Sequence, residues 1–253
     1  MSDTPCTEAV RLCHLYPDEM NIYADRGNIA VFRRRLAWRG FGLQVTEARP
    51  GDAVDPAAHD LYYLGGGQDR DQKIVAEDLA ATKGDALRSA AADGAAMLFV
   101  CGGIQLAGDG YTGVDGTRLP GIGVLDLDTV AGDTRMIGDL VIRARLDGDE
   151  HEVVGYENHA GRTHLGPGAT PLGQVVHGNG NNGSDGTEGA VQARVIGTYL
   201  HGPLLPKNPW LADVVLRWAL EHRVGASVEL AALDDRLEHE AHRRAAARAG
   251  VRR

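Results

Sequence analysis

A single cysteine stands where a nucleophile would be exposed. Cys101 directly follows the apolar run Ala96–Val100 and precedes the sequence GGIQL at residues 102–106, which favours a helix. A nucleophile at a tight turn from strand to helix is held exposed, with the next backbone N–H beside it to receive an oxyanion. A helix N-terminus also lowers the pKa of a thiol, and the thiolate is the reactive form. We therefore predict a catalytic nucleophile at Cys101, the alternative being a buried structural cysteine.

A histidine follows another expected strand about 100 residues later. His201 comes directly after the apolar residues 195–200 and precedes Gly202 and Pro203. Cysteine and histidine residues that act together are usually distant in sequence and converge in the fold. His201 is thus the candidate base for Cys101, although the chain has ten histidines and a core or surface role is the alternative.

Three consecutive glycines, Gly65 to Gly67, end the apolar run Leu61–Leu64. The backbone N–H groups of such a loop can supply a second oxyanion donor. A phosphate cradle is the competing interpretation, and a plain turn is the third. The chain contains neither the GxxxxGK[ST] motif nor a GxGxxG motif between a strand and a helix, which excludes an ATP site of the P-loop form.

Other polar residues give weaker signals. Arg135 is a candidate for bidentate binding of a carboxylate, against the alternative of an exposed ion pair. Residues 157–159 (ENH) and 178–182 (GNGNN) are polar clusters whose role the sequence alone does not define. His239 and His242 share a helix face but do not form an HExxH motif, so a solvated helix explains them and no metal site is predicted.

The candidate residues lie at the ends of strands that must share one edge of a sheet. Strands alternate with helices over residues 10–110, which implies parallel strands with crossover helices. Such sheets bind ligands at the carboxyl ends of their strands. The strands are expected at residues 10–15, 43–48, 61–64 and 96–100, with helices at residues 28–39, capped by Asn28, and 70–93, interrupted at Gly84.

The pattern changes after residue 110. Residues 137–145 and 152–156 predict a hairpin that turns at residues 147–149, and residues 161–190, rich in Gly and Asn, predict a loop. Helices are expected at residues 209–223 and 229–249. We predict one domain over residues 1–253, with a loose tail at residues 1–9 and a C-terminal helix within residues 229–253.

Composition narrows the class of protein. Against 26 Lys and Arg there are 35 Asp and Glu, so the net charge is −9 and nucleic acid is not expected as a partner. The chain has three cysteines, at positions 6, 13 and 101, an odd number that forms no CxxC motif. This fits a reducing compartment rather than a disulfide framework. No signal peptide or run of 18 apolar residues is present, so a soluble, cytoplasmic protein with no membrane span is expected.

Together these residues resemble the class I (triad-type) glutamine amidotransferases. Within that class the chain is similar to the cobyric-acid-synthase-like branch, and there to the glutamine amidotransferase subunits of lipid II isoglutaminyl synthase. The resemblance extends from residue 15 to residue 203. The matching segments are LYPD at 15–18, MNIYADRGN at 20–28, GGGQD at 65–69, CGGIQL at 101–106, ENH at 157–159, GRT at 161–163, GNGNN at 178–182, GTY at 197–199 and HGP at 201–203.

The resemblance implies a flavodoxin-like α/β fold and hydrolysis of L-glutamine. Cys101 would form a glutamyl thioester, His201 would transfer the protons, Gly66 and Gly102 would bind the oxyanion, and Arg135 would bind the substrate. It also implies delivery of ammonia to a Mur-ligase-like (MurT-type) subunit. That subunit would use ATP and Mg²⁺ to amidate the α-carboxylate of D-glutamate in the stem peptide of lipid II. No cofactor is expected in this chain.

Two positions depart from the pattern of the broader class. Phe99 stands where a glycine usually precedes the nucleophile, and Pro203 stands where a glutamate usually completes the triad. The cobyric-acid-synthase-like branch also lacks that glutamate. The chain therefore has no obvious carboxylate to orient His201, and we expect it either from Glu157 or from the partner subunit. Two alternative functions remain, an amidotransferase for a cobalamin-type substrate and a non-catalytic flavodoxin-like scaffold.

Overall fold

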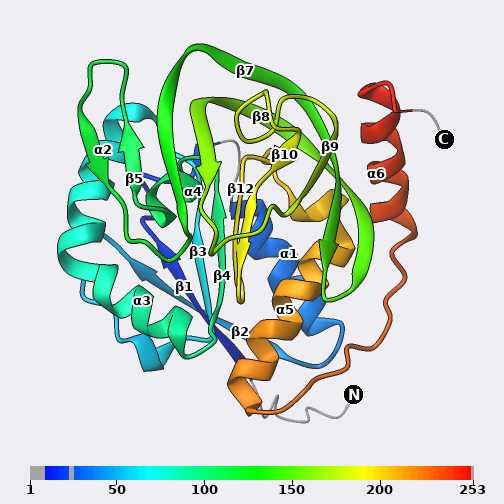
Figure 1. The fold of residues 1–253 in the computed structure, drawn as a ribbon. Helices are drawn as coiled ribbons and strands as arrows, with labels where there is room; N and C mark the ends of the chain where they lie inside the picture. Colours follow the sequence, from blue (N-terminus) through cyan, green and yellow to red (C-terminus); the bar gives the residue numbers. More distant parts are fainter. Residues whose placement is uncertain (1–8, 23–25, 252–253) are drawn as a thin grey trace.

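A mostly parallel sheet forms the centre of the molecule (Figure 1). The computed structural model describes residues 9–22 and 26–251, so the predicted tail lies almost entirely outside the described residues. All neighbouring strands of this sheet are parallel except β11 and β12, which confirms the predicted fold class. In spatial order the strands are β11 (Ala190–Gln192), β12 (Val195–Thr198), β4 (Ala96–Val100), β3 (Leu61–Leu64), β1 (Ala9–Leu15) and β2 (Gly42–Ala48).

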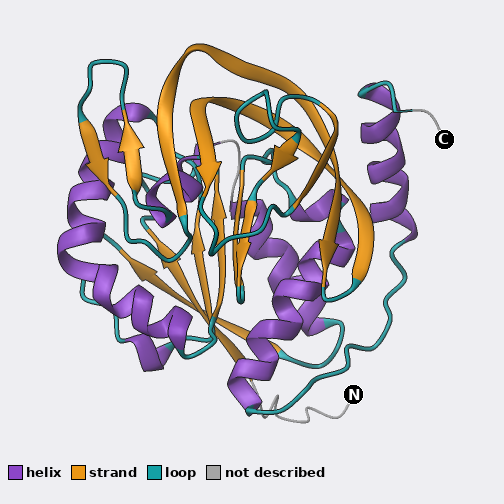
Figure 2. Ribbon diagram, in the orientation of Figure 1, coloured by secondary structure: helices purple, strands orange, loops and turns teal. Residues whose placement is uncertain are grey.

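Helices cover both faces of this sheet, as Figure 2 shows. Leu61 and Tyr63 of β3 pack in one core with α1 and α5, whereas Tyr62 and Leu64 pack in the other with α2 and α3. Because both faces of β3 and β4 are buried, these strands are continuous apolar runs rather than alternating ones. The flanking helices are α1 (Arg26–Ala37), α2 (Asp69–Asp78), α3 (Gly84–Ala92) and α5 (Pro209–Val224), with a π-helical turn at Leu79–Lys83 between α2 and α3.

A second, mostly antiparallel sheet is built around the long ribbon of β7 and β8. The ribbon turns at Asp147 and Gly148, both with positive φ (54° and 90°), as the predicted hairpin requires. Tyr156 of β8 forms an isolated antiparallel bridge with His201, so β8 crosses the carboxyl end of β12. The strands of the second sheet are β5 (Gly110–Thr112), β6 (Arg118–Pro120), β7 (Leu127–Leu146), β8 (Asp149–Leu165), β9 (Gly173–His177) and β10 (Thr187–Glu188).

The structure corrects two of the predicted elements, the start of the first helix and the loop at residues 161–190. Asn28 does not cap α1, which begins at Arg26; its buried side chain instead donates to the Tyr63 hydroxyl (2.9 Å) and accepts from the Leu205 amide (2.9 Å). Residues 161–190 are not all loop, because β8 continues to residue 165 and β9 and β10 follow. The strands β9 and β10 are short, and their sequences, GQVVH and TE, lack the apolar alternation that marks a strand.

The C-terminal helix begins later than predicted. Helix α6 spans Arg236–Arg248, and its Ala246, with Ala249 just beyond it, packs on Val141 and Val154 of the β7–β8 ribbon. Figure 1 shows α6 beside the ribbon, joined to α5 by a long connection. None of the helices in residues 9–22 and 26–251 has the length and apolar character needed to cross a membrane.

Candidate active site

Cys101 occupies a strained turn between β4 and the short helix α4 (Gly102–Ala107), as predicted. Its φ of 53° and ψ of −111° are unusual for a residue with a side chain. Such a conformation costs about 1–3 kcal/mol and persists only where the surrounding structure enforces it. Here the Cys101 amide donates to the Thr198 carbonyl oxygen (2.8 Å), which ties the turn to the end of β12. Cys101 is 8% exposed, so it is largely buried at this turn.

Glycines allow the two loops beside Cys101 to approach each other. A Cβ atom on Gly103 would lie 2.8 Å from the Leu64 carbonyl oxygen, and one on Gly66 would lie 3.0 Å from the Cys101 Cβ. The distance at Gly103 is too short for a real side chain, so the start of α4 requires glycine, and the distance at Gly66 is tighter than most Cβ contacts. Gly66 therefore lies against the Cys101 side chain. The oxyanion role of Gly66 and Gly102 stays a prediction, which this packing supports.

A polar cavity of about 520 Å³ opens beside Cys101. We call it the Cys101 cavity. Its volume is sufficient for an amino acid, and backbone from both sheets contributes to its wall. It is lined by Ile22, Gly67, Gln68, Arg70, Gln72, Cys101, Gly102, Gln105, Tyr111, Arg135, Asn158, His159, Ala160 and Gly161.

Arg135 lies in this cavity and is held there by Asn158. Its Nε donates to the Asn158 Oδ1 (2.9 Å) and its Nη2 to the Asn158 carbonyl oxygen (3.0 Å), while the Cys101 Sγ lies 4.0 Å from the same carbonyl oxygen. Among the described residues Arg135 forms no salt bridge, so the alternative of an exposed ion pair does not hold. The structure thus places Arg135, the predicted carboxylate-binding residue, close to Cys101, the predicted nucleophile.

His201 follows β12, the neighbour of β4, and is buried (1% exposed). Its backbone exchanges hydrogen bonds of 3.0 and 3.2 Å with Tyr156, and the two rings meet edge to face at 5.8 Å. Burial, and to a lesser extent the nearby His159 and Lys207, lowers the pKa of His201 to about 4. The imidazole is therefore neutral at neutral pH, which is the form that accepts a proton from a thiol.

The sequence did not reveal the role of Glu157, which organises the GNGNN segment. Its carboxylate accepts from the Asn179 amide (2.8 Å), the Asn179 Nδ2 (2.7 Å) and the Gly180 amide (3.0 Å). Burial acts to raise the pKa of Glu157, but the neighbouring His159 and the N–H donors of residues 179–180 hold it below its usual range. The polar loop therefore folds around a buried carboxylate, and His201 is not one of these hydrogen-bond donors.

A second buried carboxylate, Glu188, also escaped the sequence analysis. It accepts from the Thr198 hydroxyl (3.0 Å) and the Tyr199 amide (2.7 Å), and complete burial raises its pKa to about 8. It thereby fixes the backbone at residues 198–199, a corner from which the chain continues to His201. No local pattern marks Glu188, because its donors, Thr198 and Tyr199, are about ten residues away in the sequence and meet it only in the folded chain.

A chain of buried hydrogen bonds continues from this corner to the cavity. The Tyr199 hydroxyl bonds with Thr163 (2.7 Å) and accepts from Gln105 (3.1 Å), which in turn accepts from Gln72 (2.6 Å). Gln72 and Gln105 both line the Cys101 cavity. In the described part of the chain no group of His, Cys, Asp and Glu side chains is arranged to hold a metal ion.

Comparison with known proteins agrees with this geometry. Residues 11–209 match the model of the CobB/CobQ-like glutamine amidotransferase domain. The chain is 39% identical to the GatD subunit of the glutamine-hydrolyzing lipid II isoglutaminyl synthase of Staphylococcus aureus (strain N315), over 90% of this chain and 91% of that protein. It is 38% identical to the corresponding subunit of Streptococcus pneumoniae, over 91% of this chain and 88% of that protein.

A more distant relative supports the family, and two solved structures support the fold. A cobyric acid synthase of Rhodobacter capsulatus is 32% identical over 78% of this chain but 41% of its own length. A chain in the structure of PurLQS from Thermotoga maritima superposes with a TM-score of 0.54, at 14% identity, over 85% of this chain and 98% of that chain. A glutamine amidotransferase from the same organism gives 0.52, at 15% identity, over 96% and 94%. The chain therefore belongs to the CobB/CobQ-like glutamine amidotransferase family.

Proposed function

We propose that this chain is the glutaminase subunit of a lipid II isoglutaminyl synthase. The observation that carries the proposal is the placement of Cys101. It lies on a strained turn, in a cavity of amino-acid size, between Arg135 and the strand end that leads to His201. The similarity to two GatD subunits over nine-tenths of the chain supports the choice of this synthase.

The chemistry follows from the states of the two side chains. His201, neutral because it is buried, takes the proton of the Cys101 thiol, and the thiolate attacks the side-chain amide carbon of glutamine. The C–N bond breaks as His201 returns the proton to the leaving ammonia, and a glutamyl thioester remains. Water then attacks the thioester and releases glutamate. The backbone N–H groups of Gly66 and Gly102 would stabilise the oxyanion in both steps.

The ammonia would pass to a Mur-ligase-like partner subunit, of the MurT type. The partner would use ATP and Mg²⁺ to activate the α-carboxylate of D-glutamate in the stem peptide of lipid II, and the product would be D-isoglutamine. The experiment is to purify the chain with the protein that accompanies it. Supplied with glutamine, ATP and lipid II, the pair should convert that carboxylate to an amide, detected by mass spectrometry, and Cys101→Ser should stop the glutamine-dependent reaction.

An amidotransferase for a cobalamin-type substrate is the second candidate. The 32% identity to a cobyric acid synthase favours it, but the chain aligns with only 41% of that enzyme. The accompanying protein distinguishes the two candidates, since the first requires a ligase that binds lipid II.

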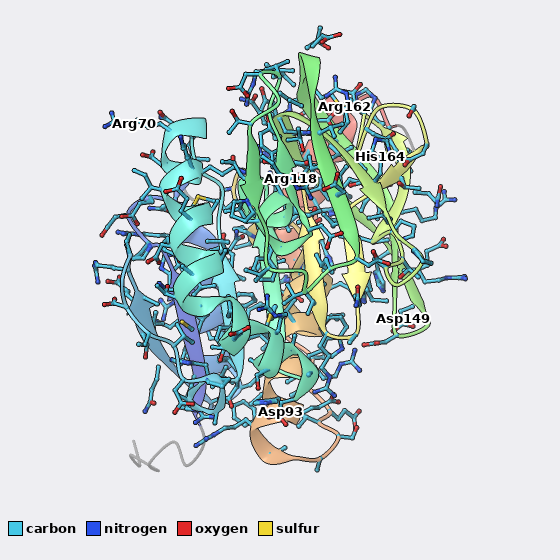
Figure 3. The ribbon with its side chains drawn as sticks, turned by 60° about the vertical axis from the view of Figure 1, so that its left-hand side comes forward. Arg70, Asp93, Arg118, Asp149, Arg162 and His164 are labelled. Carbon is cyan, nitrogen blue, oxygen red and sulfur yellow. The ribbon has the colours of Figure 1, made fainter. Side chains whose placement is uncertain are left out.

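Substitution of Arg135 tests the substrate site. The planar guanidinium can bind the α-carboxylate of glutamine with two parallel hydrogen bonds, which lysine cannot reproduce. We expect Arg135→Lys and Arg135→Ala to lower kcat/KM for glutamine by roughly 10- to 150-fold, the loss of one charge-assisted contact of about 1.5–3 kcal/mol. The matched control is Arg118→Lys, because Arg118 pairs with Asp128 on the second sheet and does not line the cavity. Figure 3 labels Arg118. An unchanged kcat/KM for Arg135→Ala would refute this role.

Nucleotide binding tests the division of labour between the subunits. The chain contains neither of the two phosphate-binding glycine motifs, so the purified chain alone should not bind ATP. Isothermal titration calorimetry with ATP and Mg²⁺ measures this directly. Binding of ATP to the chain alone at micromolar affinity would contradict the proposal that the partner subunit performs the ATP-dependent step.

A further inference from the structure

The strand pairing of the β7–β8 ribbon is interrupted at Arg135. The register shifts between Ala131 and Met136, so residues 132–135 of β7 lie opposite Ala160 of β8 alone. A bulge of this kind bends the strand and re-aims its side chains, and bulges are frequent next to active sites. Here the last residue of the bulge is Arg135, which lines the Cys101 cavity. The shape of the bulge therefore determines where the Arg135 guanidinium lies.

Arg162 of β8, labelled in Figure 3, spans this bulge. Its Nη2 donates to the Thr134 carbonyl oxygen (2.9 Å), which belongs to the peptide bond before Arg135. Its Nη1 donates to the carbonyl oxygens of Ala160 (2.8 Å) and Gly161 (3.3 Å) on the other strand. Backbone carbonyl groups need hydrogen-bond donors, and the interrupted ladder does not provide them here. The Arg162 side chain thus joins the two strands where their backbones are not paired.

The residues around Arg162 leave room for this arrangement. A Cβ atom on Gly132 would lie 2.5 Å from the Arg162 Cζ, so the guanidinium lies directly against the backbone of the bulge. Successive residues of a strand point to opposite faces, and the neighbours of Arg162 in the GRT segment face the interior. A Cβ atom on Gly161 would lie 2.7 Å from the Tyr199 hydroxyl, with which the Thr163 hydroxyl forms a hydrogen bond (2.7 Å). The GRT segment therefore directs only its arginine to the bulge.

We propose that Arg162 is a positioning residue for glutamine binding, because it fixes the bulge that presents Arg135 to the substrate. The inference rests on the proposed binding of the α-carboxylate of glutamine by Arg135. Asn158 holds the side chain of Arg135 through its Oδ1 (2.9 Å), and Arg162 holds the peptide bond that leads to it. Arg162 itself does not line the Cys101 cavity, so it acts through Arg135 and not on the substrate.

Arg162→Ala should raise KM for glutamine roughly tenfold and leave kcat within about twofold of the wild type. A contact made equally to substrate and transition state changes KM alone. Arg162→Lys should behave in the same way, because one ammonium group cannot replace the planar fork that donates to both strands. The measurement is ammonia release over a range of glutamine concentrations. A wild-type KM in either variant, or a loss confined to kcat, would overturn the proposal.

A double-mutant cycle tests whether Arg162 acts through Arg135. If it does, Arg162→Ala in the Arg135→Ala background should change kcat/KM by less than about twofold, although it costs roughly tenfold in the wild type. Losses that multiply would show that Arg162 acts independently, which overturns the inference and leaves the substrate role of Arg135 intact. A wild-type KM in Arg135→Ala would instead refute the proposed substrate site, and the inference with it.

Two controls separate this positioning role from general damage to the site. Arg143→Ala removes an exposed arginine of the same ribbon, which pairs with Glu150 (3.4 Å), and should leave KM unchanged. Iodoacetamide has no carboxylate, so it should alkylate Cys101 at the wild-type rate in Arg162→Ala, as followed by peptide mass spectrometry. An equal rise in KM for Arg143→Ala would show an effect of surface charge, and slower alkylation would show that the substitution disturbs Cys101. Both results overturn the proposal.

Discussion

Cys101→Ser should abolish ammonia release from glutamine and leave the fold intact. Serine matches cysteine in size and can adopt the same turn, but its hydroxyl is not ionised by the surroundings that ionise a thiol. We expect kcat to fall by roughly 10⁴-fold or more, the scale on which removal of a catalytic nucleophile acts. The measurement is ammonia release from glutamine by the purified variant, with circular dichroism to establish that it is folded.

Cys13→Ser is the matched control for this variant. Cys13 lies in β1 and is fully buried, and burial raises the pKa of its thiol to about 12, so it is a poor nucleophile. The control should retain the wild-type kcat. Wild-type activity in Cys101→Ser, with loss of activity in Cys13→Ser, would show that Cys101 is not the nucleophile.

The second large effect should come from the partner subunit. A catalytic histidine needs an acceptor on its other ring nitrogen, and loss of the orienting carboxylate costs about 10⁴-fold in serine proteases. Pro203 cannot supply such a group, and Glu157 already accepts three hydrogen bonds and faces His159. We therefore expect a carboxylate of the partner to complete the site. The isolated chain should hydrolyse glutamine slowly and be accelerated by roughly 10²- to 10⁴-fold in the complex.

This expectation is tested by measuring ammonia release with and without the partner. Each Asp and Glu of the partner near the interface is then changed to Asn or Gln, and one of these variants should bind but fail to accelerate. Equal rates for the isolated chain and the complex would contradict the expectation. So would complete loss of activity in both states for Glu157→Gln, since that result would make Glu157 the orienting carboxylate.

The sequence was most informative about the parallel sheet. Strands β3 and β4 are buried on both faces, so their continuous apolar runs and the glycines that follow them locate two strand ends. The rule that parallel sheets bind ligands at those ends then brings Cys101 close to Gly66 without any knowledge of the fold. Likewise, the predicted hairpin was found because residues 147 and 148 favour a tight turn.

The second sheet and its carboxylates were harder to predict for a physical reason. The segment that contains β9 and β10 is held by hydrogen bonds with residues distant in sequence rather than by burying an apolar face: Asn179 donates to Glu157, and Glu188 accepts from Tyr199. Local periodicity carries no trace of such contacts. Asn28 illustrates the same limit, since its residue type favours a helix cap while its buried amide bonds to Tyr63 and Leu205.

Labelling with a glutamine analogue tests the central claim most directly. 6-Diazo-5-oxonorleucine has the shape of glutamine and carries a diazoketone in place of the side-chain amide. A nucleophile that attacks this group becomes alkylated as N₂ leaves. We predict one adduct per chain, on the peptide that contains Cys101, with none on Cys6 or Cys13, and protection by excess glutamine. Labelling of Cys6 or Cys13 alone, or no labelling of Cys101 in the complex with the partner, would contradict the account.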